Sequence, residues 1–184
     1  MLAQSLTSFS PRRCALSAVV FAVALLCAFP AIAGRNAELV LSPALTRELN
    51  LVLKTSEALH KSLVRQDDEQ VEIGLKDLLQ QIDHARALSH LAKPHERAHL
   101  VRILDAAREQ FEVTKTAYGE QRRAHLEDAF NQLVNLVRIY RLDRAYGIFF
   151  CPKDKTTWVQ KGAKPQNPFR TEGGREPCGM RVER

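Results

Sequence analysis

Apolar residues recur along four stretches of the chain at alternating steps of four and three positions, while the positions between them are mostly charged or polar. This spacing places the apolar side chains on one face of an α-helix. One apolar stripe per helix is typical of a small bundle that buries a common core. The four stripes are Leu45, Leu49, Val52, Ser56, Leu59 and Leu63; Val71, Leu75, Leu78, Ile82, Ala85 and Ser89; Leu100, Leu104, Ala107, Phe111, Thr114 and Tyr118; and Leu126, Phe130, Leu133, Val137 and Tyr140.

Helix start and stop signals separate these stripes. Ser42 before Pro43 is an N-cap followed by proline at the first helical position. Asp67 is expected to cap the second helix, and Pro94 breaks the second helix from the third. Gly119 can take the left-handed conformation that ends the third helix. Because the connections are short, we predict an all-α domain, an up-down-up-down four-helix bundle.

The pattern changes after about Arg144. Two short β-prone runs, residues 148–151 and 156–160, flank a turn-like segment and predict a small hairpin, followed by extended chain. This tail has too little apolar surface to fold alone, so we expect it to pack on the bundle. We therefore predict one domain, with the bundle at residues 34–146 and the tail at 147–184. The residues expected to pack the tail are Trp158, Asn167, Pro168 and Phe169.

Residues 1–33 have the pattern of a signal peptide. Arg12 and Arg13 precede an apolar run that ends in Ala31-Ile32-Ala33, a small-x-small cleavage signal before Gly34. The run is about as long as a membrane span, so retention as an anchor stays open, although the cleavage signal favours removal. We therefore expect a periplasmic or secreted protein with no stable membrane span after cleavage, and a mature chain long enough for one domain.

Export places the mature chain in an oxidising compartment, where cysteine pairs usually form disulfides. Two of the four cysteines lie in the signal segment, which leaves Cys151 and Cys178. A bridge between them would stabilise the fold by roughly 3 kcal/mol. Residues 151–184 hold eight basic and four acidic residues, so the basic excess of the mature chain lies in the tail. A solvated basic tail is the better interpretation, because an exported protein rarely meets nucleic acid.

The segment "PHERAH" contains the pattern H-E-x-x-H, with His95, Glu96 and His99. In zinc peptidases two such histidines on a helix hold the metal and the glutamate acts as general base. A peptidase also needs a third ligand and a substrate-binding edge strand, and no sheet is predicted around this helix. Zinc metallopeptidase is kept as an alternative, and no enzyme class is otherwise supported.

Metal binding of another kind has more support. Four histidines, His84, His90, His95 and His99, lie around the junction of the second and third predicted helices. In the predicted bundle the tail begins at the same end, which would bring Cys151 near them. Imidazoles and thiolates bind copper or zinc. The competing interpretation is a set of surface histidines and a disulfide that removes both thiolates.

The tail carries a resemblance to a known family. The order Cys151-Pro152, Trp158, Asn167-Pro168-Phe169, Cys178-Gly179 is similar to the C-P-M, W, N-P-Y, C-G tail of an uncharacterised family of exported bacterial helical-bundle domains. The segments "LVRQDDEQVEIGLKDLLQQID" and "EQRRAHLEDAFNQLVNLVR" resemble its paired helices and its last helix, and His95 matches its histidine near a helix start.

Domains of this family occur alone or joined to periplasmic adaptor subunits of copper and other heavy-metal efflux pumps. The resemblance therefore implies metal handling, with His95, Cys151 and Cys178 as ligands. Lys153 stands where the family has methionine, and Met180 is the only methionine left in the mature chain. This departure disfavours a copper(I) site built on thioethers, since a soft ligand has become a cation.

The leading hypothesis is a non-enzymatic periplasmic module that binds copper or zinc, or that assists a periplasmic efflux or envelope protein. The alternative is a disulfide-stapled helical interaction domain that binds no metal. The predicted metal ligands are His95, Cys151 and Cys178, with His99, His90 and Met180 as further candidates.

Overall fold

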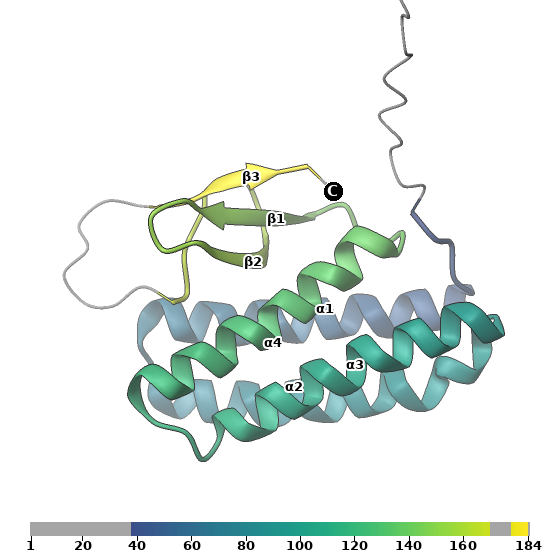
Figure 1. Ribbon diagram of the computed structural model, residues 1–184, viewed down its shortest axis with the longest axis horizontal. Coiled ribbons are helices and arrows are strands. Elements are labelled where there is room, and N and C mark those ends of the chain that lie inside the picture. The colour runs from purple at the N-terminus through teal and green to yellow at the C-terminus, as the bar shows by residue number, and fades with distance from the viewer. Residues whose placement is uncertain (1–37, 170–177, 184) are drawn as a thin grey trace, which may run out of the picture. The chain divides into compact units, whose positions relative to one another are not determined.

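The computed structural model describes residues 38–169 and 178–183, so the predicted signal peptide lies outside the described residues. The chain is mostly helical, with a small antiparallel sheet at its C-terminal end (Figure 1). No helix in the described ranges is long and apolar enough to cross a membrane. The helices are α1 (Pro43–Arg65), α2 (Asp68–Ala87), the short 3-10 helix η1 (Leu88–Leu91), α3 (Pro94–Thr114) and α4 (Gly119–Ile139).

The first two helices begin where the caps predict. The Ser42 hydroxyl accepts a hydrogen bond from the Leu45 N–H at 3.4 Å, and the Asp67 carboxylate accepts one from the Gln70 N–H at 3.1 Å. Each bond satisfies an N–H that lacks an intrahelical partner in the first turn. The prediction for Gly119 needs correction. Its φ of +54° is left-handed as expected, but α3 already ends at Thr114 and Gly119 begins α4.

The predicted stripes form the core, and nearly all their members are buried. Leu63 is half-buried near the end of α1. Tyr118 was wrongly assigned to the core: its side chain is 82% exposed, because α3 ends four residues before it. Successive helices pack on one another, so α2 contacts both α1 and α3, and α4 contacts α3.

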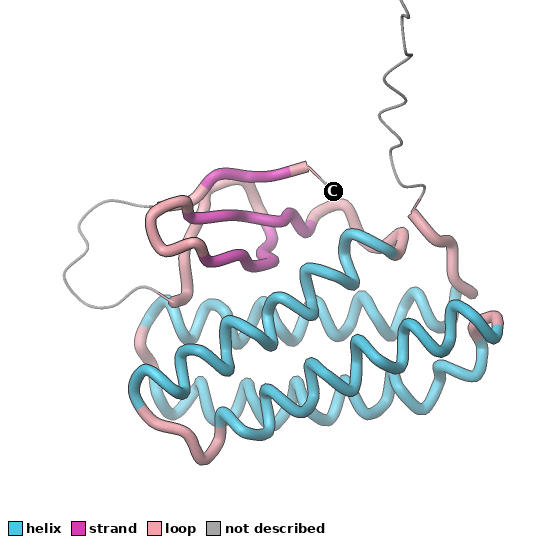
Figure 2. Tube along the Cα trace, in the orientation of Figure 1, coloured by secondary structure: helices cyan, strands magenta, loops and turns pink. Residues whose placement is uncertain are grey.

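The predicted hairpin is present. Strand β1 (Tyr146–Cys151) pairs antiparallel with β2 (Thr156–Lys161), with Phe149 opposite Trp158. A third strand, β3 (Met180–Val182), pairs with the other edge of β1 and was not predicted, because three residues carry no readable alternation. The sheet order is therefore β2-β1-β3 (Figure 2).

The sheet lies on the helices, with β2 against α4 and α1 and β1 against α4. Trp158 is fully buried, and its ring stacks on Phe149 with centroids 6.0 Å apart. Phe169 packs edge-on against Phe130 of α4 at 5.5 Å. Aromatic pairs of this geometry contribute about 0.5–1.5 kcal/mol beyond the area they bury. The tail therefore shares its apolar core with the bundle.

Candidate functional site

A disulfide closes the tail. Cys151, the last residue of β1, is bonded to Cys178, and both are buried. The backbone N–H of Asp154 points at the Cys151 sulfur from 3.4 Å. The bridge holds the chain that enters β3 against the end of β1. Each sulfur is bonded to the other, so neither is a thiolate ligand in this structure.

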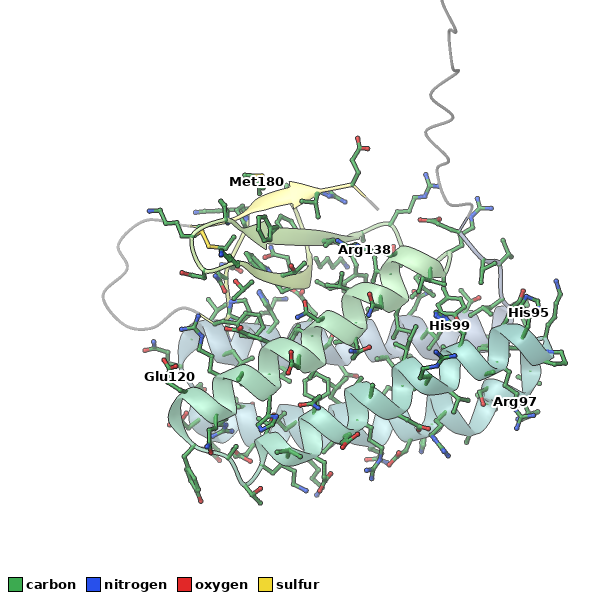
Figure 3. The ribbon with its side chains drawn as sticks, in the orientation of Figure 1. His95, Arg97, His99, Glu120, Arg138 and Met180 are labelled. Atoms are coloured by element: carbon green, nitrogen blue, oxygen red, sulfur yellow. A yellow bond between two sulfur atoms is a disulfide. The ribbon has the colours of Figure 1, made fainter. Side chains whose placement is uncertain are left out.

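The predicted metal ligands are not brought together. His95 stands in the first turn of α3 with its side chain 77% exposed, and Met180 is 53% exposed on β3. Figure 3 places these two side chains far apart. Residues 38–169 and 178–183 contain no group of three His, Cys, Asp or Glu side chains close enough to hold one metal ion. Metal binding by these residues stays a prediction.

The direction of β1 keeps Cys151 apart from His95. Tyr140, just after α4, lies beside the start of α3, where its hydroxyl is 3.4 Å from the Nδ1 of His99. The chain does return to the histidine-rich end, as expected. Figure 1 shows β1 then running back along α4, which carries Cys151 away from His95. His84 and His90 are exposed on the outside of this end.

The H-E-x-x-H glutamate faces the protein rather than solvent. Glu96 is 6% exposed, and its carboxylate lies 3.8 Å from the Lys93 ammonium and 4.0 Å from the His95 ring. The Tyr140 hydroxyl donates to the Glu96 backbone carbonyl at 3.3 Å. Burial, with the negative charge of Glu96 adding to it, raises the pKa of Tyr140 to about 12. Among the described residues, no third ligand lies close enough to complete a zinc site with the two histidines. The zinc peptidase therefore stays a prediction.

An apolar groove of about 440 Å³ opens where the end of α1 meets the starts of α2 and α4. Its apolar lining is Leu63, Val71, Leu126, Pro168 and Phe169, and its mostly polar rim is Gln66, Asp68, Gly119, Glu120, Arg122 and Arg123.

The rim arginines are already paired. Arg122 contacts Glu72, and the Arg123 guanidinium donates to Glu127 at 2.8 Å. The groove therefore suits an apolar side chain better than a free ion. Because Pro168 and Phe169 belong to the tail, the groove has this form only while the tail is docked.

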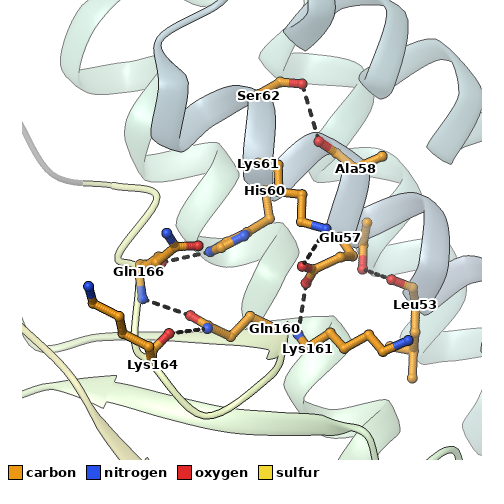
Figure 4. A network of polar contacts seen from close by, with 11 residues as sticks. Leu53, Glu57, Ala58, His60, Lys61, Ser62, Gln160, Lys161, Lys164 and Gln166 are labelled. Carbon is orange, nitrogen blue, oxygen red and sulfur yellow. Dashed lines mark hydrogen bonds and ion pairs between the residues drawn. The ribbon is translucent and has the colours of Figure 1, made fainter.

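A polar cluster that the sequence analysis missed joins the tail to α1 (Figure 4). His60 is fully buried, and its Nε2–H donates to the Gln166 carbonyl oxygen at 2.6 Å. Burial lowers the pKa of His60, while the bond to Gln166 and the charge of Glu57 act in the opposite direction. Glu57 is 8% exposed and accepts the backbone N–H of Lys161 at 2.8 Å.

Gln160 completes the cluster from the tail side. Its Oε1 accepts the Trp158 indole N–H at 2.7 Å and the Gln166 backbone N–H at 2.8 Å. Its Nε2 donates to the Lys164 carbonyl oxygen at 2.7 Å. Buried polar groups joined in this way hold a segment in one arrangement, because each loses its partner if the segment shifts.

One signal could have indicated this cluster. Leu53 is an apolar residue of α1 outside the predicted stripe, and it is fully buried. Glu57 follows it by one helical turn and His60 by almost two, so the three share a face. A helix with a second buried face needs a second packing partner, which here is the tail.

Asn167 and its neighbours shape the end of the tail. The Asn167 amide donates to Asp154 at 3.1 Å and to Thr156 at 3.2 Å, and its Oδ1 accepts the Phe169 N–H at 2.9 Å. These bonds tie the segment before the groove to the hairpin. Pro168 and Phe169 are both buried.

Comparisons with models of known protein families, with curated proteins and with solved structures find no match to this chain. The resemblance to exported domains of metal efflux systems therefore stays a prediction.

Proposed function

We propose that the mature chain is a non-enzymatic, exported interaction domain whose disulfide-stapled tail completes a groove for an apolar segment of a partner protein. The observation that carries the proposal is the composition of the groove. Pro168 and Phe169 of the tail form one wall, and Leu63, Val71 and Leu126 of the helices form the rest. A concave apolar lining with a polar rim is the usual form of a binding pocket.

The partner is expected to be another protein of the cell envelope that inserts apolar side chains. Two acidic and two basic residues stand on the rim, and both arginines have carboxylate partners. The arginines are therefore not free to bind an anionic ligand, and the charge left on the rim, from Asp68 and Glu120, is negative. Short connections between helices support an up-down-up-down order, in which the end of α1 and the starts of α2 and α4 share one end of the bundle.

The disulfide supports the proposal because it closes a loop that contains the groove wall. Cys151 and Cys178 are 27 positions apart, and Pro168 and Phe169 lie between them. A covalent closure of this kind restricts the free chain and so favours the docked tail. Reduction is therefore expected to weaken partner binding without any change in the groove residues.

The alternative, metal handling by His95, Cys151 and Cys178, requires the disulfide to be opened and the tail to move. Native mass spectrometry of protein purified without chelator or reductant separates the two. A mass two hydrogens below the full-thiol value, with no metal, supports the staple. A full-thiol mass with stoichiometric copper or zinc supports the metal site.

Selection of displayed peptides on the oxidised protein tests the groove itself. We expect enriched peptides with apolar anchors whose binding is lost in Leu63→Glu, which puts a charge into the lining. Val64→Glu is the matched control, because Val64 is the adjacent, partly exposed residue outside the lining. Peptides that bind both variants equally well, or no enriched peptide at all, would overturn the proposal.

A further inference from the structure

The contact between His60 and the tail is complete only for a neutral ring. A carbonyl oxygen accepts and does not donate, so the ring proton must sit on Nε2, opposite Gln166. Nδ1 then carries a bare lone pair. Among the described residues it is the buried side-chain polar atom without a hydrogen-bond partner.

Protonation would change this site in two ways. It would place a positive charge on a side chain that has no contact with solvent, and it would create an Nδ1–H donor with no acceptor. Both changes are costly in a protein interior. Separation of residues 162–166 from α1 would relieve them, since water could then solvate the imidazolium.

The neighbouring charges do not cancel this cost. On α1, the negative charge of Glu57 favours protonation of His60. However, the Oε2 of Glu57 already accepts the Lys161 N–H, and its Oε1 lies 3.3 Å from the Lys61 ammonium. Lys61 itself disfavours a second positive charge. The tail contributes Lys161 and Lys164, which are exposed and also positive. Burial thus lowers the pKa of His60 below its ordinary value of 6.5.

We propose that His60 is a pH-sensitive latch whose neutral ring holds residues 162–166 of the tail against α1 and whose protonation releases them. The released form binds its proton near pH 6.5, whereas the docked form binds one only at lower pH. Docking is therefore fully favoured above pH 6.5 and is lost as pH falls from 6.5 toward the lowered value. Within that window the docked-to-released ratio falls by up to about tenfold per pH unit. The latch does not depend on any partner.

Amide hydrogen exchange of the oxidised protein between pH 7.5 and 5 tests the latch. The Gln166 amide reports on residues 162–166, because it donates to the Gln160 side chain of the polar cluster. After correction for intrinsic exchange, we expect its protection to fall by up to about tenfold per pH unit below 6.5. Amides inside α3 should keep theirs.

Two variants test whether His60 causes the pH dependence. His60→Gln offers a neutral amide N–H to Gln166 and cannot be protonated in this range, so its tail protection should stay flat. His125→Gln, which alters a half-buried histidine on α4 bonded to Gln110, should keep the wild-type pH dependence. Equal pH dependence in wild type and His60→Gln, or equal loss in tail and α3, would overturn the latch.

A direct titration covers the case in which His60→Gln fails to fold. The NMR shift of the His60 ring Cε1–H in the wild-type protein reports its protonation. A midpoint clearly below 6.5 is the expected result. A midpoint at or above 6.5 would overturn the proposal, because docking would then not oppose protonation.

Discussion

Glu57 and Lys161 join the first helix to the sheet across 104 positions of sequence: the Oε2 of Glu57 accepts the backbone N–H of Lys161 at 2.8 Å. The carboxylate is 8% exposed and acts mainly as an acceptor for the backbone. Its other oxygen lies 3.3 Å from Lys61, whose side chain is 53% exposed. The contact to the strand should therefore matter more to stability than the ion pair.

Glu57→Ala should lower the free energy of unfolding by about 1–3 kcal/mol, because the Lys161 N–H loses its acceptor. Glu57→Gln should cost less, since an amide oxygen can still accept that bond. Urea unfolding of the oxidised protein measures both. Lys61→Ala is the control and should change stability by less than about 1 kcal/mol. A larger loss in Lys61→Ala than in Glu57→Ala would show that the ion pair dominates.

Removal of the disulfide by the double change Cys151→Ser and Cys178→Ser should lower the free energy of unfolding by about 3–4 kcal/mol. The bridge closes a loop of 27 positions, and its loss frees that loop in the unfolded chain. Denaturant unfolding gives the value, and reduced wild-type protein should behave like the double variant. Equal midpoints for oxidised wild type and the double variant would contradict this prediction.

Tyr140→Phe should lower the free energy of unfolding by about 1 kcal/mol, because the Glu96 carbonyl loses the hydroxyl donor. The variant should also change how the free energy of unfolding depends on pH at alkaline pH. The pKa of Tyr140 is raised to about 12, so its hydroxyl loses its proton near pH 10 in the unfolded state and only at higher pH in the folded state. The Tyr140 hydroxyl therefore makes its full contribution to the free energy of unfolding below pH 10, and this contribution falls as pH rises from 10 to 12.

Thermal unfolding between pH 9 and 11.5 checks this sign. Wild type should lose stability faster than Tyr140→Phe as pH rises, so the two curves should converge. Parallel curves would mean that the hydroxyl ionises equally easily in both states.

Gly74→Val should push α1 and α2 apart and cost about 1–3 kcal/mol. A Cβ at this position would lie 3.2 Å from the Cα of Leu59, and backbone cannot move aside as a flexible side chain can. Lys76→Val, at an exposed position of α2, controls for the lower helix propensity of valine. Equal losses of melting temperature in the two variants would exclude a packing cause.

The oxidised protein should show no zinc or copper affinity that depends on His95. Its ring is exposed beside Glu96, and both cysteine sulfurs are bonded to each other. Isothermal titration of oxidised wild type and of His95→Ala should give the same weak binding, because both proteins keep the disulfide. His84→Ala serves as a control for another exposed histidine. Stoichiometric metal that His95→Ala removes would establish the predicted site instead.

The four helices and the hairpin could be predicted because their signals are local. Leu45, Leu75, Leu104 and Leu133 are fully buried members of stripes that the 3.6-residue period alone selects. The caps at Ser42 and Asp67 act within three residues of themselves. The misassignment of Tyr118 follows from the same rule, because periodicity does not mark where a helix ends.

The candidate site was less predictable because its contacts are distant in sequence. A disulfide between Cys151 and Cys178 was already an alternative, since an exported chain with two cysteines favours one. The groove wall at Phe169 and the burial of Glu57 were not readable, because each depends on which helix face the tail covers.

Sequence alone determined the helical segments, their main apolar faces and the hairpin, since each rests on spacing or on residue chemistry, and it gave the disulfide as one of two interpretations of the cysteines. Tertiary structure alone decided the path of β1, which separates Cys151 from His95, and the pairing of β3. It also decided the burial of His60, whose hydrogen-bond partner Gln166 lies 106 positions away. The physical reason is range: local periodicity fixes which side of a helix faces inward, but the fold of the whole chain fixes what covers it.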